Sequence, residues 1–196
     1  SGPKTARMLL GTPCVDAVVL ETARGGLLRE GLGFDVCDVG AVLNVTADHL
    51  GAKDVHSLED LARVKSVVVE SVMRRGASIL NADDPLTVRM ARHARGRIVW
   101  FAGTANAAAR APLAAHIAAG GMAVTCEEGA IILYDAGKRT AVLDIARIPS
   151  TLGGAAEFNI WNALAATANW RRPGIGSGKI RTPGASGKLA RRGRIE

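Results

Sequence analysis

The sequence has few cysteines and no long apolar stretch, and each absence argues against a class of protein. Its three cysteines, Cys14, Cys37 and Cys126, are scattered without the spacing of a zinc site, so we expect reduced structural thiols, compatible with a cytoplasmic protein. No run of 18 apolar residues could form a membrane-spanning helix. The chain starts without an initiator Met or an apolar signal region, and we expect an internal fragment of a longer protein.

A phosphate-binding loop is also lacking, although one segment resembles it. Residues 174–180 read Gly-Ile-Gly-Ser-Gly-Lys-Ile. The loop requires a further glycine where Pro173 stands, and Ser or Thr where Ile180 follows the lysine. The segment is therefore rejected as a phosphate-binding loop.

The net charge of +7 belongs to the C-terminal end of the chain. Residues 171–196 hold eight Lys and Arg against one acid, which leaves 17 basic and 17 acidic residues in 1–170. The tail has no periodicity able to bury a face, so we expect it to be disordered. A basic tail can bind nucleic acid, but this one lacks aromatic residues for base stacking, and nucleic-acid binding is the least favoured interpretation.

Over most of residues 1–170 the apolar pattern alternates between strands and helices. The pattern predicts buried strands over 16–22, 39–45, 77–81 and 97–102, and helices over 57–75, ended by Gly76, and 84–94, after a first helix that ends at Gly11. This alternation indicates an α/β fold with a mostly parallel sheet flanked by helices. Short runs over 122–125, 130–134 and 140–143 predict a small antiparallel β meander, and a last helix is expected over 155–170. We expect one domain over 1–170, followed by the tail 171–196.

Two side chains able to bind a metal follow the first two predicted strands. Glu21 ends the first strand, and His49 lies in the turn after the second. The carboxyl ends of parallel strands share one edge of a sheet, and Mg²⁺ is bound by one or two carboxylates together with phosphate oxygens. Each residue also has an ordinary alternative: Glu21 could pair with Arg24 or Arg29, and His49 could be a structural hydrogen-bonding residue.

Five further residues are candidates for a site, each with a structural alternative. Lys65 falls on the apolar face of its helix, where its stem could snorkel or its amine, or a carbamate formed on it, could face a phosphate or metal. Asp84 precedes a proline and is explained by helix capping alone. Asn81 closes the third strand, while Asn159 and Asn162 open the last helix, where Asn commonly caps.

The order and spacing of these motifs resemble the Mur ligase superfamily, and within it the cyanophycin synthetase family. The resemblance covers about residues 1–170. The stretches that carry it are Ser1–Arg7, Glu21–Gly33, Asp48–Leu50, Lys65, Asn81–Pro85, Phe158–Asn159 and Asn162–Ala166. It implies a central ATPase-like domain, related to P-loop NTPases, that is incomplete at its N-terminus because the family's phosphate-binding loop would precede Ser1. The tail 171–196 stands where the family has a further domain.

The resemblance also implies a reaction and a site. An ATP- and Mg²⁺-dependent ligase would join arginine to the side chains of an aspartate polymer through an acyl phosphate. Glu21 and His49 are then the metal ligands, Lys65 and His49 the catalytic residues, and Asn81, Asp84, Asn159 and Asn162 the nucleotide-binding residues. The resemblance further implies a cytoplasmic enzyme without membrane contact, whose full-length relatives form homo-oligomers.

Several alternatives stay open at this point. The chain could be a non-catalytic remnant that keeps the fold without holding ATP, or a fragment of a cell-wall or folylpolyglutamate ligase.

Overall fold

The computed structural model describes residues 2–15, 17–47, 55–104 and 110–170. Within this part of the chain the residues form two compact units, one up to Asp35 and the other from Val36 to the end of the last helix. No helix among the described residues is long and apolar enough to cross a membrane.

The first unit contains two short helices, α1 (Pro3–Leu10) and α2 (Arg24–Glu30). Helix α1 ends at Leu10 and is capped by Gly11, whose N–H donates to the Arg7 carbonyl; this glycine was predicted to close the helix. Gly33 has a φ of +82°, and a Cβ there would lie 2.8 Å from Pro3 Cα. Glycine is therefore needed at position 33 both for its backbone conformation and for its close approach to α1.

The strand predicted over residues 16–22 is wrong for the part that the structure describes. Residues 17–23 form no strand, and 90% of Val19 is exposed. A short apolar run shows that residues are hydrophobic but not that a neighbouring strand pairs with them. As a consequence, Glu21 is an exposed residue in an irregular segment before α2 rather than the end of a buried strand.

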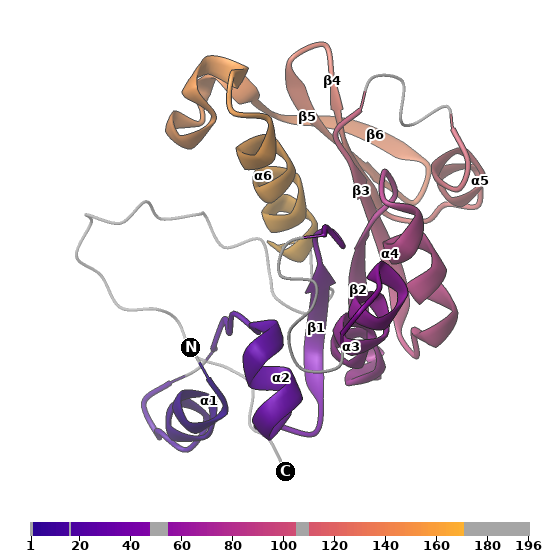
Figure 1. The fold of residues 1–196 in the computed structure, drawn as a ribbon. Coiled ribbons are helices and arrows are strands. Elements are labelled where there is room, and N and C mark those ends of the chain that lie inside the picture. Colours follow the sequence, from indigo (N-terminus) through magenta and orange to yellow (C-terminus); the bar gives the residue numbers. More distant parts are fainter. Residues whose placement is uncertain (1, 16, 48–54, 105–109, 171–196) are drawn as a thin grey trace. The chain divides into compact units, whose positions relative to one another are not determined.

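The second unit is built on one six-stranded sheet whose strands lie in chain order (Figure 1). The strands are β1 (Cys37–Val42), β2 (Val72–Asn81), β3 (Arg97–Ala102), β4 (Ala123–Glu127), β5 (Ala130–Asp135) and β6 (Lys138–Asp144). Neighbours from β1 to β4 are parallel, and β4, β5 and β6 form an antiparallel meander. The predicted α/β class with a mostly parallel sheet is confirmed.

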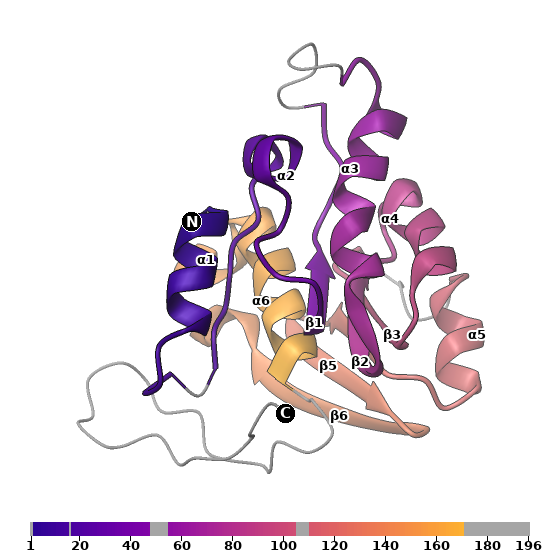
Figure 2. The same ribbon diagram turned by 90° about the horizontal axis from the view of Figure 1, so that it is seen from below.

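Helices cover both faces of this sheet (Figure 2). One face carries α3 (Leu58–Glu70), α4 (Pro85–Met90) with the 3₁₀ turn η1 (Ala91–His93), and α5 (Leu113–Ala118). The other carries α6 (Glu157–Trp170), which follows the 3₁₀ turns η3 (Ile145–Arg147) and η4 (Pro149–Gly154). In β3, Trp100 packs in the cluster that contains Leu61 of α3, and its neighbour Phe101 packs in the cluster that contains Leu164 of α6. Successive strand residues therefore fill two cores, as expected for a sheet buried on both sides.

Helix α3 begins where the sequence predicts and ends earlier. Ser57 Oγ accepts from Asp60 N at 3.0 Å, and Asp60 Oδ2 accepts from Ser57 N at 3.0 Å, which completes the capping box. The predicted end at residue 75 is wrong, because α3 stops at Glu70 and β2 starts almost at once. Gly76 lies inside β2, where a Cβ would collide with the β1 backbone, so this glycine allows close strand packing and does not cap the helix.

The cysteines are free thiols, as expected for reduced residues. Cys37 and Cys126 are half-buried, and burial raises the pKa of both thiols. Cys14 is exposed. A raised pKa favours the protonated thiol over the reactive thiolate at both positions.

Glu127 at the end of β4 makes the stability of the meander depend on pH. Burial acts to raise the pKa of Glu127, but hydrogen bonds from Thr125 Oγ1 (2.7 Å), Tyr134 Oη (2.8 Å) and the Arg139 guanidinium (2.9 Å) outweigh it and lower that pKa. A lowered pKa in the folded state stabilises the fold above the unfolded pKa, about 4.3, and this stabilisation is lost as the pH falls through the folded value.

We therefore expect Glu127→Gln to lower the free energy of unfolding by about 1 kcal/mol at pH 7 and by a smaller amount at pH 3. Urea denaturation at both pH values measures this difference. The exposed neighbour Glu128, changed to Gln, is the matched control and should follow the unchanged protein at both pH values. An equal loss at pH 7 and pH 3 for Glu127→Gln would contradict the prediction.

Candidate functional site

Polar side chains gather at the carboxyl edge of the sheet, where the chain leaves β1, β2 and β3. The connection from β2 to α4 supplies Asn81, Asp83 and Asp84, and α3 supplies Lys65. In parallel α/β sheets this edge is where ligands bind. Each of these side chains has a structural role, because it forms a hydrogen bond with a backbone group just after the end of a neighbouring strand.

Residues 43–45, here called the β1-exit segment, are held by three side chains from other elements. Asn81 Nδ2 donates to the carbonyl of residue 43 at 2.9 Å, and Lys65 Nζ donates to the carbonyl of residue 44 at 2.6 Å. Asp84 Oδ2 accepts the N–H of residue 45 at 2.6 Å. Three consecutive backbone groups are thus fixed by an amide, an ammonium and a carboxylate, two of which are charged and bond more strongly than neutral groups.

Asp84 combines this contact with the capping of α4. Its Oδ1 accepts from the N–H of Leu86 at 2.8 Å, so the capping interpretation of Asp84 is confirmed. Asn81 is 2% exposed, and its Oδ1 accepts from the N–H of Asp83 at 2.9 Å. Both residues shape the edge of the sheet, and their contact with a nucleotide stays a prediction.

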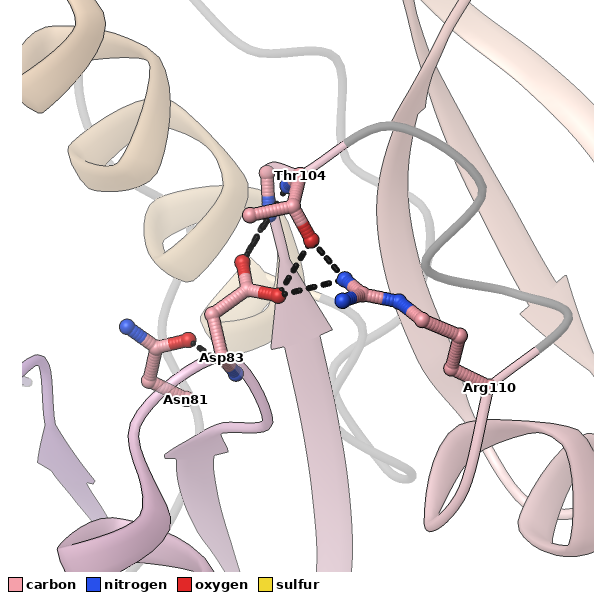
Figure 3. A network of polar contacts seen from close by, with 5 residues as sticks. Asn81, Asp83, Thr104 and Arg110 are labelled. Atoms are coloured by element: carbon pink, nitrogen blue, oxygen red, sulfur yellow. Dashed lines mark hydrogen bonds and ion pairs between the residues drawn. The ribbon is translucent and has the colours of Figure 1, made fainter.

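Asp83 joins the end of β2 to the end of β3 and is the site residue that sequence reasoning missed (Figure 3). Its Oδ2 accepts from the N–H groups of Gly103, at 2.7 Å, and Thr104, at 3.2 Å. Its Oδ1 accepts from Thr104 Oγ1 at 2.6 Å and from Arg110 Nη2 at 3.2 Å. The side chain of Asp83 is 9% exposed, while that of Arg110 is 55% exposed. The available signal was the pair of adjacent acids in Asn81–Pro85, of which capping explains only one.

The first turns of α6 lie at the same edge. The Trp161 indole packs against Gly103, directly after β3, where any Cβ would collide with it. Trp161 Nε1 is buried and has no acceptor among the described residues. Asn159 Nδ2 donates to the Ser150 carbonyl at 2.7 Å, and Asn162 is exposed. Asn81 and Asp84 therefore share this edge with the packing of Trp161 on Gly103, and the nucleotide contacts of Asn159 and Asn162 stay predictions.

The contacts described above for the carboxyl edge of the sheet include neither of the two predicted metal ligands, Glu21 and His49. Glu21 belongs to the first unit, where it lines a cavity of about 20 Å³, enough for one water. His49 lies outside the described residues. Within the described ranges, three or more His, Cys, Asp or Glu side chains nowhere meet as a metal-binding group. Mg²⁺ needs only one or two carboxylates when phosphate oxygens complete its shell, so the roles of Glu21 and His49 stay predictions.

Comparison with known proteins now identifies the fold family. Residues 5–169 match the Mur ligase middle domain model. The chain belongs to the Mur ligase family. A crystal structure of MurF from Acinetobacter baumannii matches 70% of this chain and 26% of its own, with 20% sequence identity and a TM-score of 0.43.

This Mur ligase chain is similar to enzymes of two kinds. Cyanophycin synthetase of Crocosphaera subtropica is 45% identical over 166 residues, which cover 85% of this chain and 19% of that enzyme. UDP-N-acetylmuramoyl-tripeptide–D-alanyl-D-alanine ligase of Mycobacterium leprae is 33% identical over 94 residues, which cover 47% of this chain and 18% of that enzyme. The chain thus spans about a fifth of the length of each relative.

Proposed function

We propose that this chain is part of the central module of an ATP-dependent ligase that joins arginine to the side-chain carboxylates of an aspartate polymer. The observation that carries the proposal is the carboxyl edge of β1–β3, where Asn81, Asp83 and Asp84 form a braced platform beside the first turns of α6. The choice of substrate rests on the similarity to cyanophycin synthetase, which extends over 85% of the chain, against 47% for the cell-wall ligase.

The proposed reaction has two steps. The γ-phosphoryl group of ATP is transferred to a substrate carboxylate, which gives an acyl phosphate and ADP. The amine of the second substrate then attacks the acyl carbon, the amide bond forms, and inorganic phosphate leaves while the amine loses a proton. Mg²⁺, when bound, would neutralise charge on the phosphates, with Glu21 and His49 as its proposed protein ligands.

The described residues contribute to this reaction mainly by positioning. Lys65 is proposed to support catalysis through its charge at the exit of β1, where its ammonium holds the residue-44 carbonyl. Asn81 and Asp84 set the shape of the nucleotide platform, and Asn159 and Asn162 are proposed to contact the nucleotide from α6. Preformed geometry of this kind favours phosphoryl transfer because the enzyme's main tasks there are orientation and charge stabilisation.

The α6 contribution can be tested by ATP binding. We expect the double variant Asn159→Ala/Asn162→Ala to bind ATP about tenfold more weakly, because two polar contacts with the ligand are removed. Isothermal titration calorimetry with Mg²⁺ present measures the affinity.

The control lies on the same helix. Asn169→Ala removes an exposed asparagine near the other end of α6 and should leave ATP affinity unchanged. Equal ATP affinity in the double variant and the unchanged chain, with both melting at the same temperature, would remove α6 from the proposed site.

A further inference from the structure

A groove runs between α3 and α4 on the sheet face opposite α6. Its lining consists of Glu59, Ala62, Arg63 and Ser66 from α3 and of Leu86, Arg89, Met90, Arg92 and His93 from α4 and η1. Spacings of three, four and seven place most of these residues on facing stripes of the two helices. The cavity volume is about 210 Å³. None of these nine residues holds the strand exits described above.

The charges of the groove are unbalanced toward positive. Three guanidinium groups, those of Arg63, Arg89 and Arg92, face a single lining carboxylate, that of Glu59. Arg89 pairs with Glu59 at 3.2 Å, but these side chains are 56% and 67% exposed, so the pair is weakly held. In the described part of the chain Arg63 makes no ion pair.

Arg92 and His93 complete the wall at the η1 end. Arg92 Nε donates to His93 Nε2 at 3.1 Å, which leaves the terminal nitrogens of that guanidinium for another acceptor. His93 Nδ1 lies 3.9 Å from Glu70 Oε1, which in turn accepts from Ser66 Oγ at 3.0 Å. The nearby acid Glu70 is thus engaged by other groups, and the arginines keep their surplus charge.

The floor of the groove is apolar, which favours a ligand that carries an aliphatic group next to its charged group. Met90 is 3% exposed and Leu86 is 9% exposed, and Ala62 lies beside them. A volume of 210 Å³ is below the range of about 300–1,000 Å³ typical of pockets for whole small molecules. A carboxylate on a short aliphatic stem fits such a floor and wall, since guanidinium groups bind carboxylates with two parallel hydrogen bonds.

We propose that the α3–α4 groove binds a segment of acidic peptide, with carboxylate side chains paired to Arg63 and Arg92. A nucleic acid is disfavoured because the lining contains no Phe, Tyr or Trp on which bases could stack. The choice of an aspartate-rich peptide rests on the proposed function, because a ligase that modifies an aspartate polymer acts on a chain of repeated carboxylates. The groove would hold a part of that polymer away from the reacting end.

The test uses a fluorescently labelled oligo-aspartate peptide and the full chain, so that the basic residues 171–196 are present in every sample. The double variant Arg63→Ala/Arg92→Ala should weaken peptide binding about tenfold. The control Arg74→Ala/Arg75→Ala removes the same charge from two exposed arginines at the start of β2 and should change the affinity less than twofold. Fluorescence anisotropy at fixed salt concentration measures both affinities.

Two results would overturn the proposal. Equal weakening by both double variants, or by neither, would show binding through net charge or through another part of the chain. Competition by oligouridylate as effective as that by unlabelled oligo-aspartate would show a general polyanion surface. ATP affinity, measured on the same samples, should be unchanged in both double variants. Groove-dependent peptide binding in a chain that binds no ATP would refute the proposed function and leave the groove proposal standing.

Discussion

Replacing Asp83 by Ala is expected to lower the free energy of unfolding by about 3 kcal/mol. The carboxylate accepts hydrogen bonds from two backbone N–H groups, of Gly103 and Thr104, and from the Thr104 hydroxyl, and it pairs with Arg110. Its removal leaves backbone donors at the end of β3 without an acceptor in a largely buried place. The cost of unsatisfied donors exceeds the gain from an average hydrogen bond, which is why the expected loss is large.

Urea denaturation at pH 7 measures this loss. Asp135→Ala is the matched control, because Asp135 ends another strand of the same sheet and its side chain makes no hydrogen bond or ion pair among the described residues. The control should change the unfolding free energy by less than about 0.5 kcal/mol. A loss below about 1 kcal/mol for Asp83→Ala would show that Asp83 does not hold the β2 and β3 exits together.

Lys65→Met is expected to loosen the β1-exit segment and to weaken ATP binding about tenfold, while lowering the unfolding free energy by only about 1–2 kcal/mol. Methionine keeps an unbranched apolar side chain on α3 but cannot donate to the residue-44 carbonyl, which Lys65 Nζ reaches at 2.6 Å. Amide hydrogen exchange should accelerate at residue 45, whose N–H is held by Asp84 in the same segment.

Three controls separate this positioning role from general stability. Lys138→Met removes an exposed lysine from β6 and should change neither exchange at residue 45 nor ATP affinity. Lys65→Arg retains a charged donor, so its exchange rate at residue 45 and its ATP affinity should lie closer to those of the unchanged chain than the values for Lys65→Met do. Asp83→Ala is destabilised without a change at Lys65, so it shows how much faster exchange at residue 45 becomes through loss of stability alone. If Lys65→Met alters exchange at residue 45 no more than Lys138→Met does, the ammonium does not fix the segment.

The sequence predicted those features that depend on local chemistry. The capping box of Ser57 and Asp60 and the Asp84 cap of α4 were readable because a short polar side chain acts within three residues of itself. The meander was readable because Gly-containing turns separate β4, β5 and β6. Apolar runs of strand length also gave β3 its correct bounds, Arg97–Ala102.

Features that depend on a distant partner could not be predicted in the same way. The apolar run before Glu21 has the composition of a strand but no strand pairs with it in the described structure, and Val19 is exposed. Lys65 stood out on an apolar face, yet its partner is a backbone carbonyl, which no sequence pattern marks. Asp83 was missed for the same reason, since its partners at residues 103 and 104 follow a different strand. A contact between a side chain and the backbone at the end of another strand can be identified only when the fold is known.

The measurement that tests the central claim most directly is amide hydrogen exchange of the full chain with and without ATP and Mg²⁺. If the carboxyl edge of β1–β3 is the nucleotide site, ATP should slow exchange at residues 81–84, at 103–104 and in the first turns of α6. Slower exchange confined to other parts of the chain, or no change at an ATP concentration that saturates binding, would contradict the assignment of this edge.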